Sequence, residues 1–121
     1  MTRVLIIEDN PVNMKLAAFL LQNAGYEVLQ AVDAEIGLQV ARDELPELVL
    51  MDMQLPGIDG VTATRQLKTD PATRHIKIVA LTAFAMNGDE ERFRTAGCDA
   101  YVAKPIRYQA FLSLVESILK A

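Results

Sequence analysis

The chain alternates short apolar runs with longer segments in which apolar residues recur every three or four positions. The short runs have the length of strands and are bounded by polar or turn-forming residues. They predict five β-strands, at residues 3–7, 27–31, 48–51, 76–81 and 100–103. The third run, LVLM, has no polar position, which is typical of a central strand in a parallel sheet, where both faces are buried.

The segment after the first run predicts a helix. Asn10 is a good N-cap, Pro11 suits the first helical position, and Gly25 suits the C-terminal end. Helical spacing places four apolar side chains on one face of this helix. We expect that face to be buried: Val12, Leu16, Phe19 and Leu20.

Similar signals predict four further helices. They run from an Asp33 cap to about Glu44, within Ile58–Lys68, from after Asn87 to Gly97, and from about Tyr108 to Lys120. The apolar positions of the first of these four are Ile36, Leu38, Val40 and Ala41, and those of the last are Phe111, Leu114, Val115 and Ile118.

Five strands alternating with five helices predict right-handed crossovers and a parallel sheet covered on both faces. The expected fold class is therefore α/β, a flavodoxin-like doubly wound five-stranded sheet in the order 2-1-3-4-5. The length of 121 residues suits a single domain spanning 1–121. In such sheets ligands bind beyond the carboxyl ends of the strands, at the switch point between the first and third strands.

Polar residues follow four of the predicted strands. Glu8 and Asp9 follow the first strand, and Asp52 follows the third, so Asp9 and Asp52 should nearly touch. Crowded carboxylates raise one another's pKa unless a cation compensates. A hard divalent ion suits such oxygen ligands, and Mg²⁺ suits them best because it retains open positions for water and phosphate oxygens.

Thr82 follows the fourth strand and Lys104 the fifth. A hydroxyl and an ammonium that converge on a metal-bound carboxylate can bind an anion. Such a carboxylate can also be a nucleophile that forms an aspartyl phosphate. The metal and the lysine would stabilise the charge of the transferring phosphoryl group.

Composition and charge argue against several classes of function. The net charge of −4 argues against a nucleic-acid partner, which requires a basic face. The sequence has no apolar stretch long enough for a membrane span and no secretory signal pattern. Its single cysteine, Cys98, cannot form an internal disulfide, so a cytoplasmic location is expected.

Together these pieces resemble the receiver domain of bacterial two-component response regulators over essentially the full length. The matching pieces are Glu8-Asp9, Asp52 in DMQLPGIDG, Thr82-Ala83 and Lys104-Pro105. No one piece is specific, but their order, each at its own strand end, is highly specific. The stretch TAFAMNGDEERFRTAGCDAYVAKPI is similar to stand-alone cell-cycle regulators of the DivK kind, and to receivers fused to hybrid kinases.

The resemblance implies a role for each of these residues. Asp52 would accept a phosphoryl group from a histidine kinase or a histidine phosphotransfer protein, and Thr82 and Lys104 would bind its oxygens. The Mg²⁺ ligands would be Asp9, Asp52, the Gln54 backbone carbonyl and, through water, Glu8. The Lys104-Pro105 bond is expected to be cis. Gln54 and Phe84 would border the path of a hydrolytic water.

The expected output is phosphorylation-switched binding to a downstream protein. Tyr101 stands where the family has its rotating aromatic switch, and Tyr101, Ile106 and Tyr108 would form the docking face. The protein would then be no enzyme in the usual sense, since it catalyses only its own phosphorylation and dephosphorylation. We expect a monomer or a weak dimer.

Other interpretations compete with this one. Taken singly, Glu8 and Asp9 could favour a helix N-terminus, Asp52 could be a turn residue, Thr82 a cap and Lys104 a surface lysine. A haloacid-dehalogenase-type phosphatase would need an acid two residues after Asp52, where Gln54 stands. A flavin or nucleotide module would need a Gly- or Ser/Thr-rich loop after the first strand, where the sequence reads EDNPVN.

Overall fold

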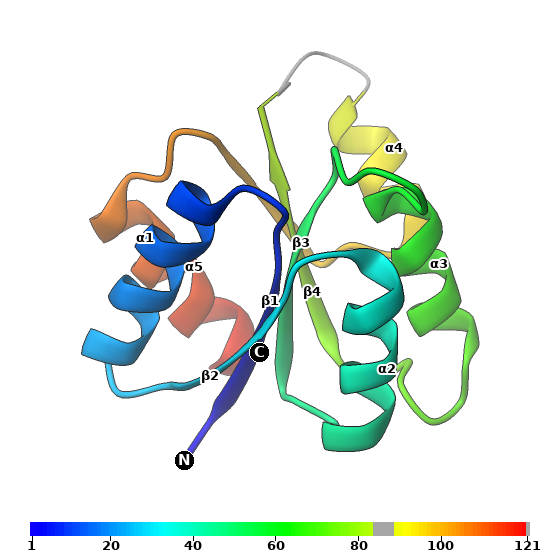
Figure 1. Ribbon diagram of the computed structural model, residues 1–121, viewed down its shortest axis with the longest axis horizontal. Coiled ribbons are helices and arrows are strands. Elements are labelled where there is room, and N and C mark those ends of the chain that lie inside the picture. Colours follow the sequence, from blue (N-terminus) through cyan, green and yellow to red (C-terminus); the bar gives the residue numbers. More distant parts are fainter. Residues whose placement is uncertain (84–88, 121) are drawn as a thin grey trace.

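The computed structural model describes residues 1–83 and 89–120 of the chain. In these residues five strands alternate with five helices (Figure 1). The elements in chain order are β1 (Arg3–Ile7), α1 (Pro11–Asn23), β2 (Glu27–Ala31), α2 (Ala34–Glu44), β3 (Leu48–Asp52), α3 (Gly60–Thr69), β4 (Lys77–Thr82), α4 (Asp89–Ala96), β5 (Ala100–Ala103) and α5 (Tyr108–Lys120).

The strands form one parallel sheet in the order β2-β1-β3-β4-β5, which confirms the predicted fold class and strand order. The register aligns the carboxyl ends of the strands. Ile7 pairs with Met51, so the residues that follow β1 lie beside Asp52. Asp52 in turn pairs with Leu81, and Thr82 pairs with Ala103. This register brings the polar residues that follow β1, β3, β4 and β5 to one edge of the sheet.

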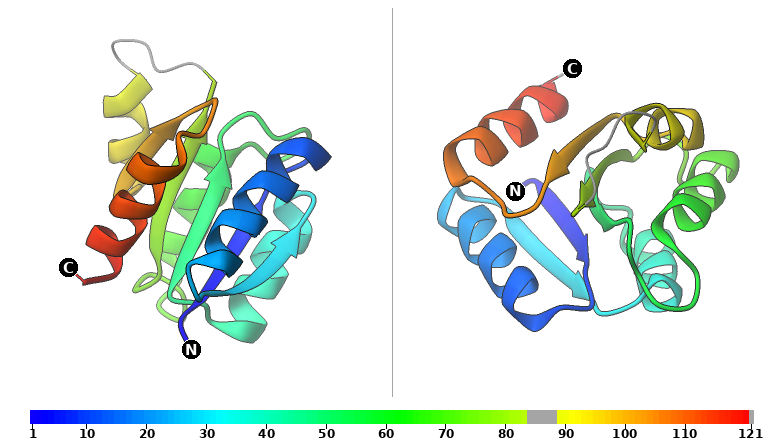
Figure 2. Two further views of the ribbon diagram at one scale, coloured as in Figure 1. Left: turned by 90° about the vertical axis from the view of Figure 1, so that its left-hand side faces the viewer. Right: turned by 90° about the horizontal axis from the view of Figure 1, so that it is seen from above.

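Helices cover both faces of the sheet. α1 and α5 lie on one face, and α2, α3 and α4 lie on the other (Figures 1 and 2). The central strands supply side chains to a core on each face because successive side chains of a strand point in opposite directions. On the α1 and α5 face, Ile6 and Leu50 pack with Phe111 and Val115 of α5. On the opposite face, Ile7 and Met51 pack with Leu38 and Leu67.

The predicted buried face of α1 is wrong. Val12, Leu16 and Phe19 are exposed, and only Leu20 packs against the core. The buried stripe consists of Met14, Ala17, Ala18 and Leu21. Both stripes have helical spacing, because apolar residues surround much of this helix. The small side chains of Ala17 and Ala18 offer the flatter face to the sheet, so the buried stripe includes them.

In the described part of the chain, the other predicted elements agree with the structure to within one or two residues at their ends, apart from one position of α2. Ile36 of α2 is exposed, and the adjacent Gly37 faces the sheet instead. A side chain at Gly37 would collide with Ile7, so this helix packs directly on β1. The predicted start of the fourth helix after Asn87, like the expected role of Phe84, lies outside the described residues.

The predicted helix caps at Asn10 and Asp33 are confirmed. Asn10 Oδ1 accepts hydrogen bonds from the N–H groups of Val12 and Asn13, at 2.9 and 3.1 Å. Asp33 caps α2 through the N–H of Ile36, and the Lys104-Pro105 bond is cis, as expected. Among residues 1–83 and 89–120, no helix combines the length and the apolarity that a membrane crossing requires.

Candidate functional site

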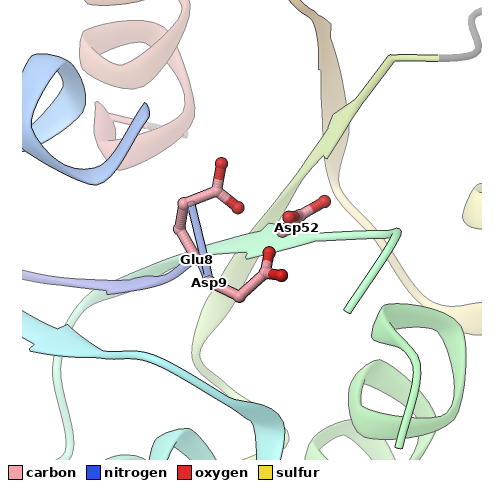
Figure 3. Close-up of side chains that lie close together, drawn as sticks. All are labelled: Glu8, Asp9 and Asp52. Carbon is pink, nitrogen blue, oxygen red and sulfur yellow. The ribbon is translucent and has the colours of Figure 1, made fainter. Parts of the chain in front are cut away.

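Three carboxylates meet at the switch point of the sheet. Glu8 and Asp9 follow β1, and Asp52 is the last residue of β3. Each offers an oxygen, and these oxygens lie within 4.8 Å of one another. Figure 3 shows the three side chains gathered at one place, with the carboxylate of Asp9 turned toward Asp52. Glu8 and Asp52 are buried, whereas Asp9 is exposed.

The ammonium of Lys104 enters the same cluster from the loop after β5. Its Nζ lies 3.0 Å from Glu8 Oε1 and 3.2 Å from Asp52 Oδ2. The side chain of Lys104 is only 16% exposed, so it is not an ordinary surface lysine. One cation therefore contacts two buried acids, and Asp9 carries a third acidic group beside them.

The environment shifts the pKa values of the two buried acids in opposite directions. Burial is the main cause that raises the pKa of Glu8 to about 7, and a hydrogen bond with Asp52 adds to it. Burial alone would raise the pKa of Asp52 as well. Hydrogen bonds from Glu8 and from the Gln54 N–H, and the nearby charge of Lys104, outweigh this effect, so the pKa of Asp52 falls below its usual value. As the pH rises, Asp52 therefore ionises before Glu8, which retains its proton until the pH approaches 7.

The capping interpretation of the acids does not fit this geometry. Asn10 caps α1 through its own side chain, so Glu8 and Asp9 are not needed for that role. Asp52 does accept the Gln54 N–H in a turn, at 2.9 Å, but its second oxygen faces Lys104. The glycine at the start of α3 permits this arrangement, because a side chain at Gly60 would collide with the Asp52 carbonyl and with Met53.

The donor set fits a hard divalent cation. Three carboxylates at one point are the oxygen ligands that Mg²⁺ prefers. Glu8 Oε2 is buried, and among the described residues it has no hydrogen-bond partner. A cation or a cation-bound water would satisfy that atom, whereas an unpaired buried oxygen is otherwise costly.

Thr82 lies at the end of β4, fully buried. Its Oγ1 accepts a hydrogen bond from Gln54 Nε2 at 3.2 Å, and the Ala83 N–H donates to Gln54 Oε1, also at 3.2 Å. The expected roles of Gln54 were a backbone metal ligand and a side chain beside the hydrolytic water, and its amide contacts with Thr82 and Ala83 were not predicted. No sequence signal distinguishes this amide from any exposed glutamine in a loop.

The three residues of the expected docking face differ in their surroundings. Tyr101 on β5 is 36% exposed, and its hydroxyl donates to Glu90 Oε2 of α4 at 3.2 Å. Tyr108, at the start of α5, is exposed, whereas Ile106 is half-buried against the α1 and α5 core. Tyr101 also lines a cavity of about 340 Å³ between β5 and α5, which neither Ile106 nor Tyr108 lines. The part played by Glu90 was not predicted.

Comparison with known proteins agrees with the fold. The sequence matches the response regulator receiver domain family over residues 4–116. It is 47% identical over 116 residues to the polar-differentiation response regulator DivK of Brucella anthropi, a match that covers 96% of this chain and 94% of that protein. DivK of Brucella ovis gives the same identity and coverage.

Solved structures show the same relationship. The receiver domain of a Pseudomonas aeruginosa sensor histidine kinase has a TM-score of 0.92 and 32% identity, over 99% of this chain and 98% of that one. That structure has a magnesium ion coordinated in its active site cleft. A receiver domain protein of Methanospirillum hungatei gives a TM-score of 0.92 at 27% identity, over 99% of this chain and 94% of that one. With the family match covering nearly the whole chain, the protein belongs to the response regulator receiver domains of two-component signalling.

Proposed function

We propose that Asp52 accepts a phosphoryl group from a phosphohistidine of a histidine kinase or a histidine phosphotransfer protein, in a Mg²⁺-dependent reaction. The observation that carries this proposal is the burial and the lowered pKa of Asp52. The carboxylate lies at the end of a central strand. Lys104 lies 3.2 Å from one of its oxygens. An ionised and positioned carboxylate is the form that attacks phosphorus.

The reaction exchanges one bond for another. An Asp52 oxygen attacks phosphorus, the P–N bond to the donor imidazole breaks, and its electron pair returns to the ring nitrogen. Lys104 is close enough to both buried acids to turn toward the new phosphoryl oxygens, where an ammonium stabilises negative charge. The Thr82 hydroxyl lies at the neighbouring strand end and would bind another oxygen.

The residues that would hold Mg²⁺ are Asp9, Asp52 and the backbone carbonyl of Gln54, with Glu8 acting through water. The bound ion supplies charge neutralisation between the acids and the incoming phosphoryl group. Glu8 must lose its proton for the cluster to reach full charge. Its pKa of about 7 lies near physiological pH, so the proton leaves readily when a cation arrives.

The proposed output is binding to a downstream protein, switched by the phosphoryl group. Thr82 would move toward that group, and Tyr101 would leave Glu90 and turn inward. The proposed docking face comprises Tyr101, Ile106 and Tyr108. The exposure of both tyrosines supports this assignment, since aromatic side chains are frequent anchors of protein interfaces.

Residues 1–121 would act as one receiver unit in the cytoplasm, as a monomer or a weak dimer. Its only reactions would be its own phosphorylation and dephosphorylation. Brucella DivK proteins carry the name polar-differentiation response regulator. By analogy, this chain would serve a signalling pathway of that general type, with a kinase upstream and a protein target downstream.

The test is intact-mass spectrometry after incubation with acetyl phosphate and Mg²⁺. Wild-type protein should gain one phosphoryl group, and Asp52→Asn should gain none. Asp43→Asn is the matched control, since Asp43 is an exposed aspartate on α2. Equal labelling of wild type and Asp52→Asn would refute the assignment, and so would the absence of labelling in wild type and Asp43→Asn.

A further inference from the structure

Gln54 connects the proposed phosphoacceptor to the end of the neighbouring strand. Its backbone N–H donates to Asp52 Oδ1 at 2.9 Å. Its side-chain amide makes two more hydrogen bonds, to Thr82 Oγ1 and from the Ala83 N–H, each at 3.2 Å. The same residue therefore contacts β3 through its backbone and the end of β4 through its side chain.

The chemistry of the partners fixes the orientation of this amide. A backbone N–H can only donate, so the Ala83 N–H must face the amide oxygen of Gln54. The amide NH₂ group then faces Thr82, whose oxygen accepts from it. A glutamate would lack the donor, an asparagine would be one methylene shorter, and a methionine would offer neither group.

These two hydrogen bonds compete with the change expected on phosphorylation. Under the proposed function, Thr82 turns toward the phosphoryl group on Asp52, which is beside it in the sheet. Phosphoryl oxygens carry charge, so they are stronger acceptors for the Ala83 N–H than the neutral amide oxygen of Gln54 is. In this scheme, Thr82 moves away from the Gln54 NH₂ group and the Ala83 N–H leaves the Gln54 amide oxygen when they approach the phosphoryl group.

We propose that the Gln54 side chain is a latch that holds Thr82 and Ala83 in the resting arrangement, and that phosphorylation must replace its two hydrogen bonds. This inference rests on the proposed function. Gln54 is a positioning residue in this scheme, since its amide acts through Thr82 and Ala83. The latch lowers the population of the binding-competent arrangement and so weakens the apparent affinity for a phosphoryl group or its mimic.

The key variant is Gln54→Met. It retains the backbone N–H that contacts Asp52 and the length of the side chain, and it removes both amide hydrogen bonds. Because Gln54 is exposed, the fold should tolerate the change, which a thermal melt by circular dichroism verifies. Gln39→Met is the matched control. The Gln39 amide also makes side-chain hydrogen bonds, but to Asp43, which lies on the same helix, α2.

The measurement is a titration with beryllofluoride in excess Mg²⁺, followed by the amide resonances of residues 82 and 83. Gln54→Met should bind the mimic on the order of tenfold more tightly than wild type, as expected for the loss of two neutral hydrogen bonds. In the free variant, the Ala83 amide resonance should also shift toward its position in the mimic-bound wild type. Gln39→Met should match wild type in both respects.

A double-mutant cycle separates the latch from simple crowding. In a Thr82→Ala background one of the two latch contacts is already absent, so Gln54→Met should give a smaller gain in affinity, from the Ala83 contact alone. A gain that persists in full would mean that Gln54 merely obstructs entry, and would overturn the proposal. Unchanged or weaker binding by Gln54→Met would also overturn it. Neither result would touch the proposed function, which fails only if wild type takes up no phosphoryl group.

Discussion

The raised pKa of Glu8 predicts an unusual pH dependence of stability in the metal-free protein. The pKa of this buried carboxyl is about 7 in the folded chain, against 4.5 for an ordinary glutamate. Below pH 4.5 the carboxyl is protonated in both the folded and the unfolded chain. As the pH rises from there, the unfolded chain releases its proton first while the folded chain still retains it, so stability falls until the pH passes about 7.

The size of this loss follows from the width of that pH range. Each pH unit between the two pKa values is worth about 1.4 kcal/mol. From 4.5 to about 7, the free energy of unfolding should therefore fall by on the order of 3 kcal/mol. Domains of this size have total stabilities of about 5–15 kcal/mol, so the loss should be large enough to measure. Asp52 acts in the opposite sense, because its lowered pKa gives stability that is lost only as the pH falls below 3.8.

The assay is urea unfolding between pH 5 and pH 8 in the presence of a chelator. Circular dichroism is the suitable probe, since the sequence has no tryptophan. Glu8→Gln should remove most of the decline, because its amide oxygen can still accept from Lys104 but the side chain has no proton to lose. Glu35→Gln, the same change at an exposed position of α2, should decline as wild type does.

Magnesium provides a second arm of the same experiment. A bound cation favours the ionised form of Glu8, so saturating Mg²⁺ should flatten the wild-type profile, and Mg²⁺ affinity should rise with pH up to about 7. The reasoning would be refuted if metal-free wild type were flat from pH 5 to pH 8, or if Glu8→Gln retained the whole decline.

Two further predictions concern the same cluster. Asp9→Asn should weaken Mg²⁺ binding, seen by calorimetry, without lowering the metal-free melting temperature, because it relieves repulsion among crowded carboxylates. A clear drop in that temperature would make Asp9 a structural residue. Thr82→Ala should still take up beryllofluoride but leave the Tyr101 ring resonances unchanged on binding, because a mimic shifts a conformation only through its differential contacts. A full Tyr101 response in that variant would exclude Thr82 as the link.

The alternation of apolar runs and helical segments was enough to predict the sheet, its strand order and the edge where the site lies. The reason is that parallel strands with right-handed crossovers leave few arrangements, and in all of them the carboxyl ends coincide. The caps at Asn10 and Asp33 were predictable because capping depends on neighbours only a few residues away.

Features that depend on contacts between distant segments were not predictable. Two apolar stripes of α1 satisfied the same spacing, and only packing against the sheet decided that Ala17 and Ala18 face inward while Val12 and Phe19 face solvent. The sequence indicated that Glu8, Asp9 and Asp52 would crowd one another at the strand ends. The structure buries Glu8 with Asp52 and Lys104, and that burial decides which acid retains the proton.

The side chain of Gln54 is the clearest case of the division between sequence and structure. Its position two residues after Asp52 follows from the sequence, and so does its nearness to the site. Its hydrogen bonds to Thr82 and Ala83 span 28 and 29 positions of the chain. Such contacts exist only after β3 and β4 pair in register, because pairing sets the distance between their ends. Local sequence determined which polar groups stand at the strand ends, and tertiary structure alone determined which of them contact one another.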